Sequence, residues 1–159
     1  MKGALAGLAA VLLIAGCESA APRVESPAIA RFFLESSNGA GTTVTLPRSG
    51  VRVVVGPKPM LTEYDVLAVE VTRVELGRCL RFQLTPAAAR DLLPLSEANV
   101  GRRLVLVLDG APLGARRIER PLADGVVAIF VETPDDTLPL LAERLRITAA
   151  DMQRRARKS

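Results

Sequence analysis

The chain has 159 residues, a formal net charge of +4 and an aromatic content of only 3%, with no Trp and no His. The shortage of aromatic side chains argues against nucleic acid as a partner, because surfaces for single strands stack the bases on aromatic rings. The absence of His removes the commonest general base and metal ligand, so we expect no enzyme, no metal site and no cofactor.

The first 16 residues have the layout of an export signal. Lys2 supplies a short positive region, and an uninterrupted apolar run over residues 4–15 follows it. This run is shorter than the roughly 20 residues that a bilayer core requires, but it suits the apolar region of a signal peptide. An ordinary signal peptide and a buried apolar helix are the alternatives.

The apolar run ends in Ile14-Ala15-Gly16-Cys17, which resembles the lipobox read by lipoprotein signal peptidase. This resemblance implies cleavage between Gly16 and Cys17, a thioether-linked diacylglycerol on Cys17 and acylation of the new amino terminus. Two or three acyl chains hold a protein on a membrane far more firmly than one. Glu18 after the cysteine favours the outer membrane where there are two. We therefore predict a lipid-anchored protein on the periplasmic or extracellular side of a membrane.

Cleavage after residue 16 leaves 159 − 16 = 143 residues, enough for one domain with its own core. Residues 17–29 are polar and interrupted by proline, which predicts a flexible tether. We expect the folded domain over residues 30–148. Residues 149–159 form a basic tail, which we expect to be solvated, although near a membrane such charges gain about 1 kcal/mol each from anionic lipid.

Runs of β-branched and aromatic residues separated by Gly and Pro predict a series of strands. These strands cover residues 31–34, 42–46, 51–55, 67–75, 79–84, 103–108, 113–118 and 126–131. Gly77 is expected at one hairpin turn, and Asp109-Gly110 is a pair that tight hairpins favour.

Two Thr-Pro pairs predict helix starts, because Thr caps a helix and Pro suits its first position. Thr85-Pro86 begins a helix that should end near Pro94, and Thr133-Pro134 begins a second one. In the second helix, Leu140, Leu141 and Leu145 are expected to face the core. The order of the elements predicts an α+β domain, a mainly antiparallel sheet with about two helices packed on one face.

Cys79 is left without an intramolecular partner if Cys17 carries lipid. The alternation over residues 79–84 places Leu80, Phe82 and Leu84 on one face and Cys79 with Arg81 on the other. A lone thiol outside the cytoplasm is either shielded or paired between chains. We expect Cys79 to be shielded.

Several ordered motifs resemble the head subdomain of the first periplasmic domain of SecD, the accessory subunit of the bacterial protein-export translocon. The matching stretches are Leu61-Thr62-Glu63-Tyr64-Asp65-Val66, Phe82-Gln83-Leu84-Thr85-Pro86, Asn99 through Gly110, Glu119-Arg120-Pro121-Leu122 and Thr133-Pro134-Asp135-Asp136. The resemblance covers about half the chain. It implies a SecD head-like α+β fold and a recognition head that contacts unfolded export substrates. A second long apolar run is missing, so we do not expect a SecD motor subunit.

The chain departs from this pattern after the Asp109-Gly110 turn. Ala115-Arg116-Arg117-Ile118 replaces an Ala-Pro-hydrophobic-Ile step, and residues 126–132 replace a glycine-rich segment. We interpret Arg116, Arg117 and Arg120 as the rim of a partner surface beside a sheet edge that adds a peptide strand. Solvated strand charges explain the three residues equally well.

Two functions follow. The first is a lipid-anchored binding or adaptor module that contacts a protein or unfolded segment in the cell envelope. The alternative is a structural envelope lipoprotein that self-associates into a homo-oligomer through an edge strand or through Cys79.

Overall fold

The computed structural model describes residues 27–158, which form eight strands, two α-helices and one 3₁₀ helix. In chain order these elements are β1 (Ala30–Glu35), β2 (Thr42–Thr45), β3 (Arg52–Leu61), the 3₁₀ helix η1 (Glu63–Asp65), β4 (Val66–Val74), β5 (Gly77–Leu84), α1 (Pro86–Glu97), β6 (Arg103–Leu108), β7 (Ala111–Arg117), β8 (Val126–Ile129) and α2 (Leu138–Ala156). Within this part of the chain, no helix has the length and apolar character needed to cross a bilayer. The predicted signal peptide, most of the tether and Cys17 lie outside the described residues.

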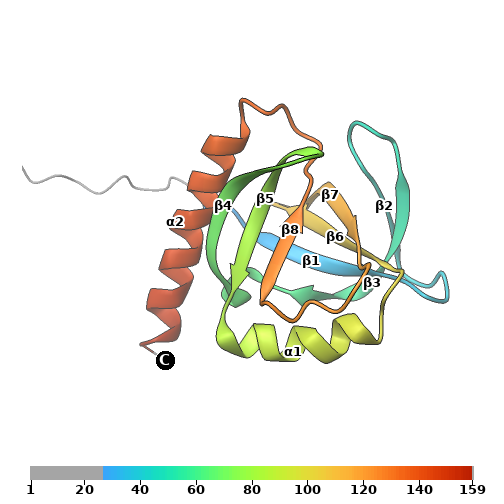
Figure 1. The fold of residues 1–159 in the computed structure, drawn as a ribbon, viewed down its shortest axis with the longest axis horizontal. Coiled ribbons are helices and arrows are strands. Elements are labelled where there is room, and N and C mark those ends of the chain that lie inside the picture. Colours follow the sequence, from blue (N-terminus) through green and yellow to red (C-terminus); the bar gives the residue numbers. More distant parts are fainter. Residues whose placement is uncertain (1–26, 159) are drawn as a thin grey trace, which may run out of the picture.

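The strands form two sheets, and every strand pair is antiparallel. The five-stranded sheet has the order β2-β3-β1-β6-β7, and the three-stranded sheet has the order β4-β5-β8 (Figure 1). The predicted α+β class is confirmed. The sequence pattern suggested one sheet, whereas β8 pairs with β5, joining residues 80–83 to residues 126–129, and so completes a second one.

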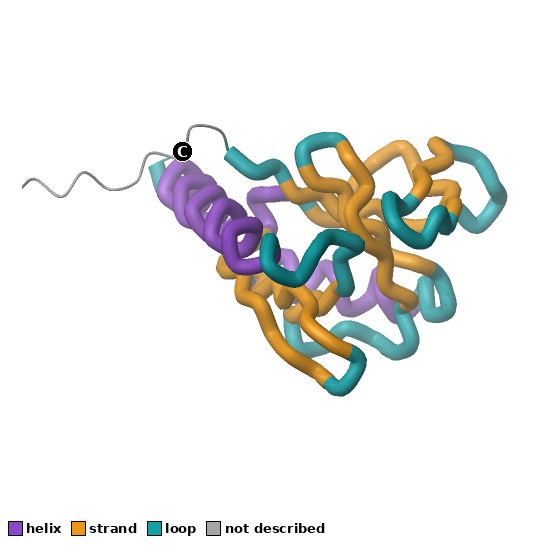
Figure 2. Tube along the Cα trace, turned by 90° about the horizontal axis from the view of Figure 1, so that it is seen from above, coloured by secondary structure: helices purple, strands orange, loops and turns teal. Residues whose placement is uncertain are grey.

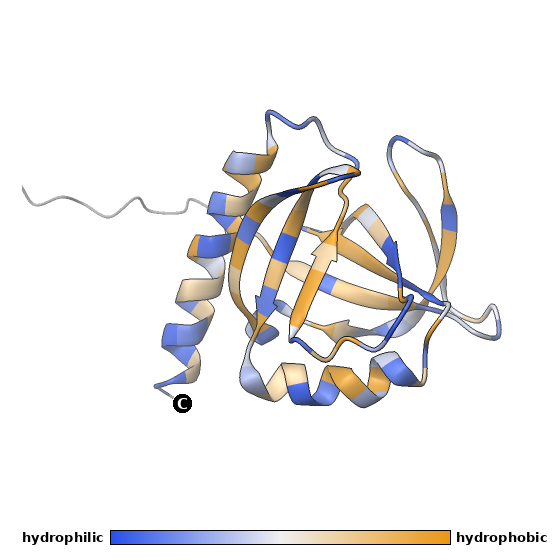
Figure 3. Cartoon of the chain, in the orientation of Figure 1, coloured by the Kyte–Doolittle hydropathy of each residue, from blue (hydrophilic) through white to orange (hydrophobic). Residues whose placement is uncertain are grey.

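The main core lies between the two sheets. Phe32 of β1 and Phe82 of β5 meet edge to face, with ring centroids 5.0 Å apart and planes at 89°. The helix α1 lies below the sheets and α2 runs beside β4, and both add buried side chains to the same core (Figures 1 and 2). Hydrophilic residues recur along both helices between the apolar ones, as expected for helices that cover a core on one side (Figure 3).

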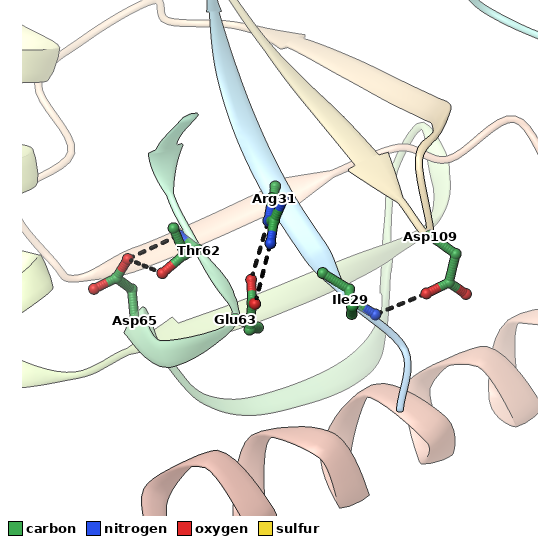
Figure 4. A network of polar contacts seen from close by, with 6 residues as sticks. All are labelled: Ile29, Arg31, Thr62, Glu63, Asp65 and Asp109. Atoms are coloured by element: carbon green, nitrogen blue, oxygen red, sulfur yellow. Dashed lines mark hydrogen bonds and ion pairs between the residues drawn. The ribbon is translucent and has the colours of Figure 1, made fainter. Parts of the chain in front are cut away.

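Short polar contacts fix the start of the domain (Figure 4). The Ile29 N–H donates to the Asp109 carboxylate at 2.8 Å, and the Arg31 guanidinium contacts Glu63 at 3.3 Å. The Thr62 N–H and hydroxyl both donate to the Asp65 carboxylate, at 2.8 and 2.9 Å. The SecD-like motif at residues 61–66 therefore builds the turn into β4, which is a structural role.

The helix α1 starts at the predicted Thr85 cap but continues past Pro94. The Thr85 hydroxyl accepts from the Ala88 N–H at 3.3 Å. The predicted end near Pro94 is wrong by about one turn, because buried Ser96 hydrogen-bonds to Leu93 and holds the last turn in place.

The predicted start of the second helix at Thr133 is also wrong. The Thr137 hydroxyl donates to the Pro134 carbonyl at 2.7 Å, so this segment forms a turn, and α2 begins at Leu138. A start at Thr133 would put Pro139 inside the helix, where it lacks an N–H and clashes with the preceding turn. The later start buries Leu138 and Leu145 and leaves Leu140 69% exposed, contrary to the prediction that Leu140 faces the core.

The same helix absorbs most of the predicted basic tail. It continues to Ala156, and Ala149 and Met152 are buried against the domain. The boundary predicted at residue 148 therefore falls inside α2, because the apolar face of the helix extends beyond it.

A second, smaller core lies on the other side of the five-stranded sheet. There Val53 and Val55 of β3 pack with Val105 of β6. The turn between β2 and β3 is fastened to the segment after β8, since the Glu132 carboxylate accepts from the Arg48 N–H at 2.8 Å and the Ser49 hydroxyl at 2.6 Å. We call β2 and the first half of β3 the β2–β3 arm. This contact holds the turn of the arm against the segment that follows β8.

Candidate functional site

The outer face of the three-stranded sheet carries a groove. Alternation along β5 turns Leu80 and Phe82 into the core and leaves Cys79 and Arg81 on the opposite face. Thr72 of β4 lies opposite Cys79, and Ala128 of β8 lies opposite Arg81, so these residues share that face. They form the floor of the groove.

One wall of the groove is the loop over residues 118–125. The Ser96 hydroxyl, which is fully buried, accepts a hydrogen bond from the Leu122 N–H at 2.9 Å and so ties this loop to α1. Ile118 and Leu122 anchor the loop in the core from either side of Arg120 and Pro121. The loop is therefore held in place although it has no regular secondary structure.

The other wall is the end of β7, where it diverges from β8. Gly114 of β7 forms an isolated bridge to Val131, two residues after the end of β8. The Arg116 guanidinium donates across to the Ala128 carbonyl of β8 at 3.0 Å. The volume of this open groove is about 450 Å³. Its lining comprises Thr72, Val74, Cys79, Arg81, Arg116, Arg120, Pro121, Leu122, Ala123, Asp124, Val126 and Ala128.

Positive charge in the groove exceeds negative charge. Arg81 forms an ion pair with Glu70 at 2.8 Å, and the Asp124 carboxylate accepts from the Val126 N–H at 3.2 Å. Arg116 is held by a carbonyl rather than a carboxylate, and Arg120 contacts no polar partner within residues 27–158. Neither of these two guanidinium groups forms an ion pair within the described residues, and with the Asp124 carboxylate counted the groove keeps a net charge of +1.

Cys79 lies in the floor of the groove but is only 1% exposed. Burial raises the pKa of its thiol, and the nearby Arg116 charge lowers it by less. The thiol is thus held in its neutral, unreactive form. The prediction of a shielded cysteine is confirmed, and an interchain disulfide through Cys79 would require the site to open.

Apolar side chains border the groove at the β4–β5 hairpin tip. Val74, which lines the groove, is 43% exposed, and Leu76 at the tip is 87% exposed. Phe130 continues the outward alternation of Val126 and Ala128 beyond β8 and is 40% exposed. Val74 lines the groove directly, whereas Leu76 lies two residues beyond Val74 and Phe130 two residues beyond the groove-lining Ala128. We call these three residues the apolar end of the site, and Arg116 with Arg120 its basic end.

The structure brings together two of the three predicted rim residues. Arg116 and Arg120 line the same groove, whereas Arg117 lies opposite Arg103 on the other face of the five-stranded sheet. Successive strand residues point to opposite faces, so Arg116 and Arg117 never shared a surface. Sequence reasoning missed Arg81, although the alternation in residues 79–84 had placed it on an outward face.

The remaining predicted site lies outside the described residues. Gly16 and Cys17 fall outside the described residues, so lipidation of Cys17 stays a prediction. Within residues 27–158, no three His, Cys, Asp or Glu side chains come together in a way that suits a metal ion.

The fold is shared with SecDF, a protein-export component, in three solved structures. One, described as a membrane component that enhances protein export, has a TM-score of 0.59 at 22% identity, and the match covers 76% of this chain and 62% of that one. SecDF in its super-membrane-facing form has a TM-score of 0.61 at 22% identity, with 75% and 18% covered. SecDF from Thermus thermophilus, a translocon-associated membrane protein, has a TM-score of 0.53 at 21% identity, with 78% and 20% covered.

These matches confirm the predicted likeness to SecD as a likeness of fold. The chain covers less than two thirds of each SecDF chain that it matches. No protein-family model and no curated protein sequence matches it.

Proposed function

We propose that this protein is a lipid-anchored binding module of the cell envelope, which holds exposed segments of other polypeptides in the groove on β4, β5 and β8. The observation that carries the proposal is the groove itself, which combines a strand floor, exposed apolar side chains at one end and unpaired guanidinium groups at the other. Binding sites commonly join apolar lining with a few polar groups that set orientation.

The shared fold supports this proposal. The SecDF proteins with this fold are described as enhancing protein export and as associated with the translocon. A domain that meets polypeptides during export has to bind apolar residues that are later buried. The exposed Val74, Leu76 and Phe130 are suited to that task.

Site-specific photo-crosslinking in cells tests the proposal. A photoreactive residue replaces Thr72 in the floor of the groove of the full chain, and a matched control replaces Arg90 on the exposed side of α1. We expect crosslinks to newly exported polypeptides at position 72, which disappear when export is blocked. Equal crosslinking at both positions, or none at position 72, would contradict the proposal.

The lipid anchor is a separate part of the proposal. Ten residues separate Cys17 from Ala28, whose N–H donates to the Thr148 hydroxyl of α2 at 2.9 Å. The eleven steps between these two residues, at about 3.5 Å each, reach at most roughly 38 Å, so an anchor would keep the domain close to the bilayer. A clickable fatty-acid analogue should label the wild type and leave Cys17→Ser unlabelled. Equal labelling of both proteins would remove the anchor from the account.

Self-association is the second candidate, and the edge strand β2 favours it. Among the described strands β2 pairs only with β3, and Thr42, Thr43 and Thr45 are exposed. A second copy can extend the sheet at such an edge. Sedimentation velocity should then show a dimer that Thr43→Pro disrupts, while a monomer at all concentrations excludes this candidate.

A further inference from the structure

The charges in the groove point to the chemistry of the segment that binds there. Arg81 already has an ion-pair partner, whereas Arg116 and Arg120 form no ion pair with any acidic side chain of the described domain, and the one other carboxylate in the lining, that of Asp124, offsets only one of their two charges. A guanidinium group matches a carboxylate with two parallel hydrogen bonds. The groove is therefore complementary to an acidic side chain.

The position of Arg116 fixes its guanidinium group at the edge of the groove and partly shields it from solvent. Its side chain is half-buried between β7 and β8, and its guanidinium group donates to the Ala128 carbonyl with one nitrogen. That bond fixes the group at the edge of the groove and leaves its other N–H groups for a ligand. An ion pair formed there is less screened by solvent than one on an open surface.

The two ends of the groove also set a spacing. Phe130, at the apolar end, is two residues from Ala128, whose carbonyl holds the Arg116 guanidinium, and four residues from Val126, which lines the groove together with Arg120. At about 3.3 Å per strand residue, this separation is roughly 7–13 Å. An extended peptide covers the same distance with two to four residues.

We propose that the groove selects extended polypeptide segments in which an aspartate or glutamate lies two to four residues from a large apolar residue. The carboxylate binds Arg116 and Arg120, and the apolar side chain packs on Val74, Leu76 and Phe130. This inference rests on the proposed function, because it names the class of segment that the same groove binds.

Fluorescence anisotropy with the full chain tests the selection. Three labelled peptides share one extended, Leu-containing sequence and differ only in a Glu, a Gln or a Lys placed three residues from the Leu. Hydrogen bonds to charged groups contribute about 1.5–3 kcal/mol, so we expect the Glu peptide to bind at least about tenfold more tightly than the Gln peptide. The Lys peptide should bind most weakly.

Protein variants locate the effect. Arg120→Gln should reduce the preference for Glu over Gln to about twofold or less, while the matched control Arg117→Gln, on the other face, should keep it. Arg120 makes no polar contact in the described domain, so its replacement should leave the thermal unfolding midpoint unchanged. Arg116→Gln is the second variant and not the first, because it removes the charge and also breaks the hydrogen bond from Arg116 to the Ala128 carbonyl.

The outcomes separate the two claims. Equal binding of the Glu and Gln peptides overturns the selection and leaves polypeptide binding intact. The same holds if Arg117→Gln and Arg120→Gln lose the preference for the Glu peptide to the same extent. Absence of binding by all three peptides, together with absence of crosslinks at position 72, overturns the proposed function as well.

Discussion

Ser96 is the single side chain on which the wall of the groove depends most. Its buried hydroxyl donates to the Leu93 carbonyl at 2.8 Å and accepts from the Leu122 N–H at 2.9 Å. Ser96→Ala would leave the Leu122 N–H without a partner in a buried place. We expect a loss of about 1–3 kcal/mol in the free energy of unfolding, measured by urea denaturation. Ser37→Ala, at an exposed turn, is the control and should change little.

Glu132 should make the closure of the β2–β3 arm sensitive to acid. Burial alone would raise the pKa of its carboxyl, but hydrogen bonds from Ser49 and Arg48 outweigh this effect and hold the pKa below its ordinary value. A lowered pKa in the folded state means that the stabilisation is present at neutral pH and is lost as the pH falls through the acid range.

Glu132→Gln tests this expectation. The variant should be less stable than the wild type at pH 7, and the difference between their unfolding midpoints should shrink below about pH 4. Glu119→Gln, which removes an exposed carboxylate outside the arm, should show no such trend. A constant difference across the whole pH range would mean that the carboxylate charge does not hold the arm.

At this scale the sequence predicted part of the site. Arg116 stands out because it departs from the SecD-like pattern, Arg120 lies four residues further along, and the two do line one groove. Arg81 and Cys79 join them only because β5 pairs with β8, which no local pattern reveals. Arg117 was misplaced for the opposite reason, since it is next to Arg116 in the chain but on the other face of the sheet.

Among the elements, the junction of β7 and β8 is the most sensitive to side-chain size. A Cβ atom added at Gly114 would lie 2.2 Å from the Phe130 carbonyl oxygen and 3.1 Å from its carbon. Gly114→Ala must therefore push the strands apart, and we expect a loss of roughly 1–3 kcal/mol in the free energy of unfolding. Because Arg116 bridges the same junction, the variant should also weaken peptide binding.

Gly56→Ala provides the matched control. A Cβ atom at Gly56 would meet only the Leu34 carbonyl oxygen, at 3.8 Å, which is an ordinary contact. Its thermal unfolding midpoint should lie close to that of the wild type. If both variants lose the same stability, close backbone approach at Gly114 is not the cause.

Local signals placed the elements well where a cap or a turn had its own chemistry. The hairpin turn at Asp109-Gly110, with φ of 49° and 85°, and the Thr85 cap occur as expected. One error arose where a distant contact decided the outcome, since buried Ser96, which extends α1 past Pro94, also accepts from the Leu122 N–H. The other arose from a local competition, because Pro139 and the turn closed by Thr137 move the start of α2.

For the whole molecule, the division into two sheets is what creates a binding surface. The core between the sheets covers the inner face of β4, β5 and β8, and α2 lies beside β4, so only the outer face with its groove stays accessible. Sequence patterns alone identified the class and the SecD likeness, since both rest on local motifs. They did not reveal the second sheet, because its closing pair joins residues 80–83 to residues 126–129.

Hydrogen exchange of the full chain, with and without the Glu-containing peptide, shows whether polypeptide segments bind in the groove. We expect slower exchange on binding in residues 72–81 and 118–130, which surround the groove, and no change in β2. Protection confined to β2, or no protection in either groove segment at saturating peptide, would contradict it.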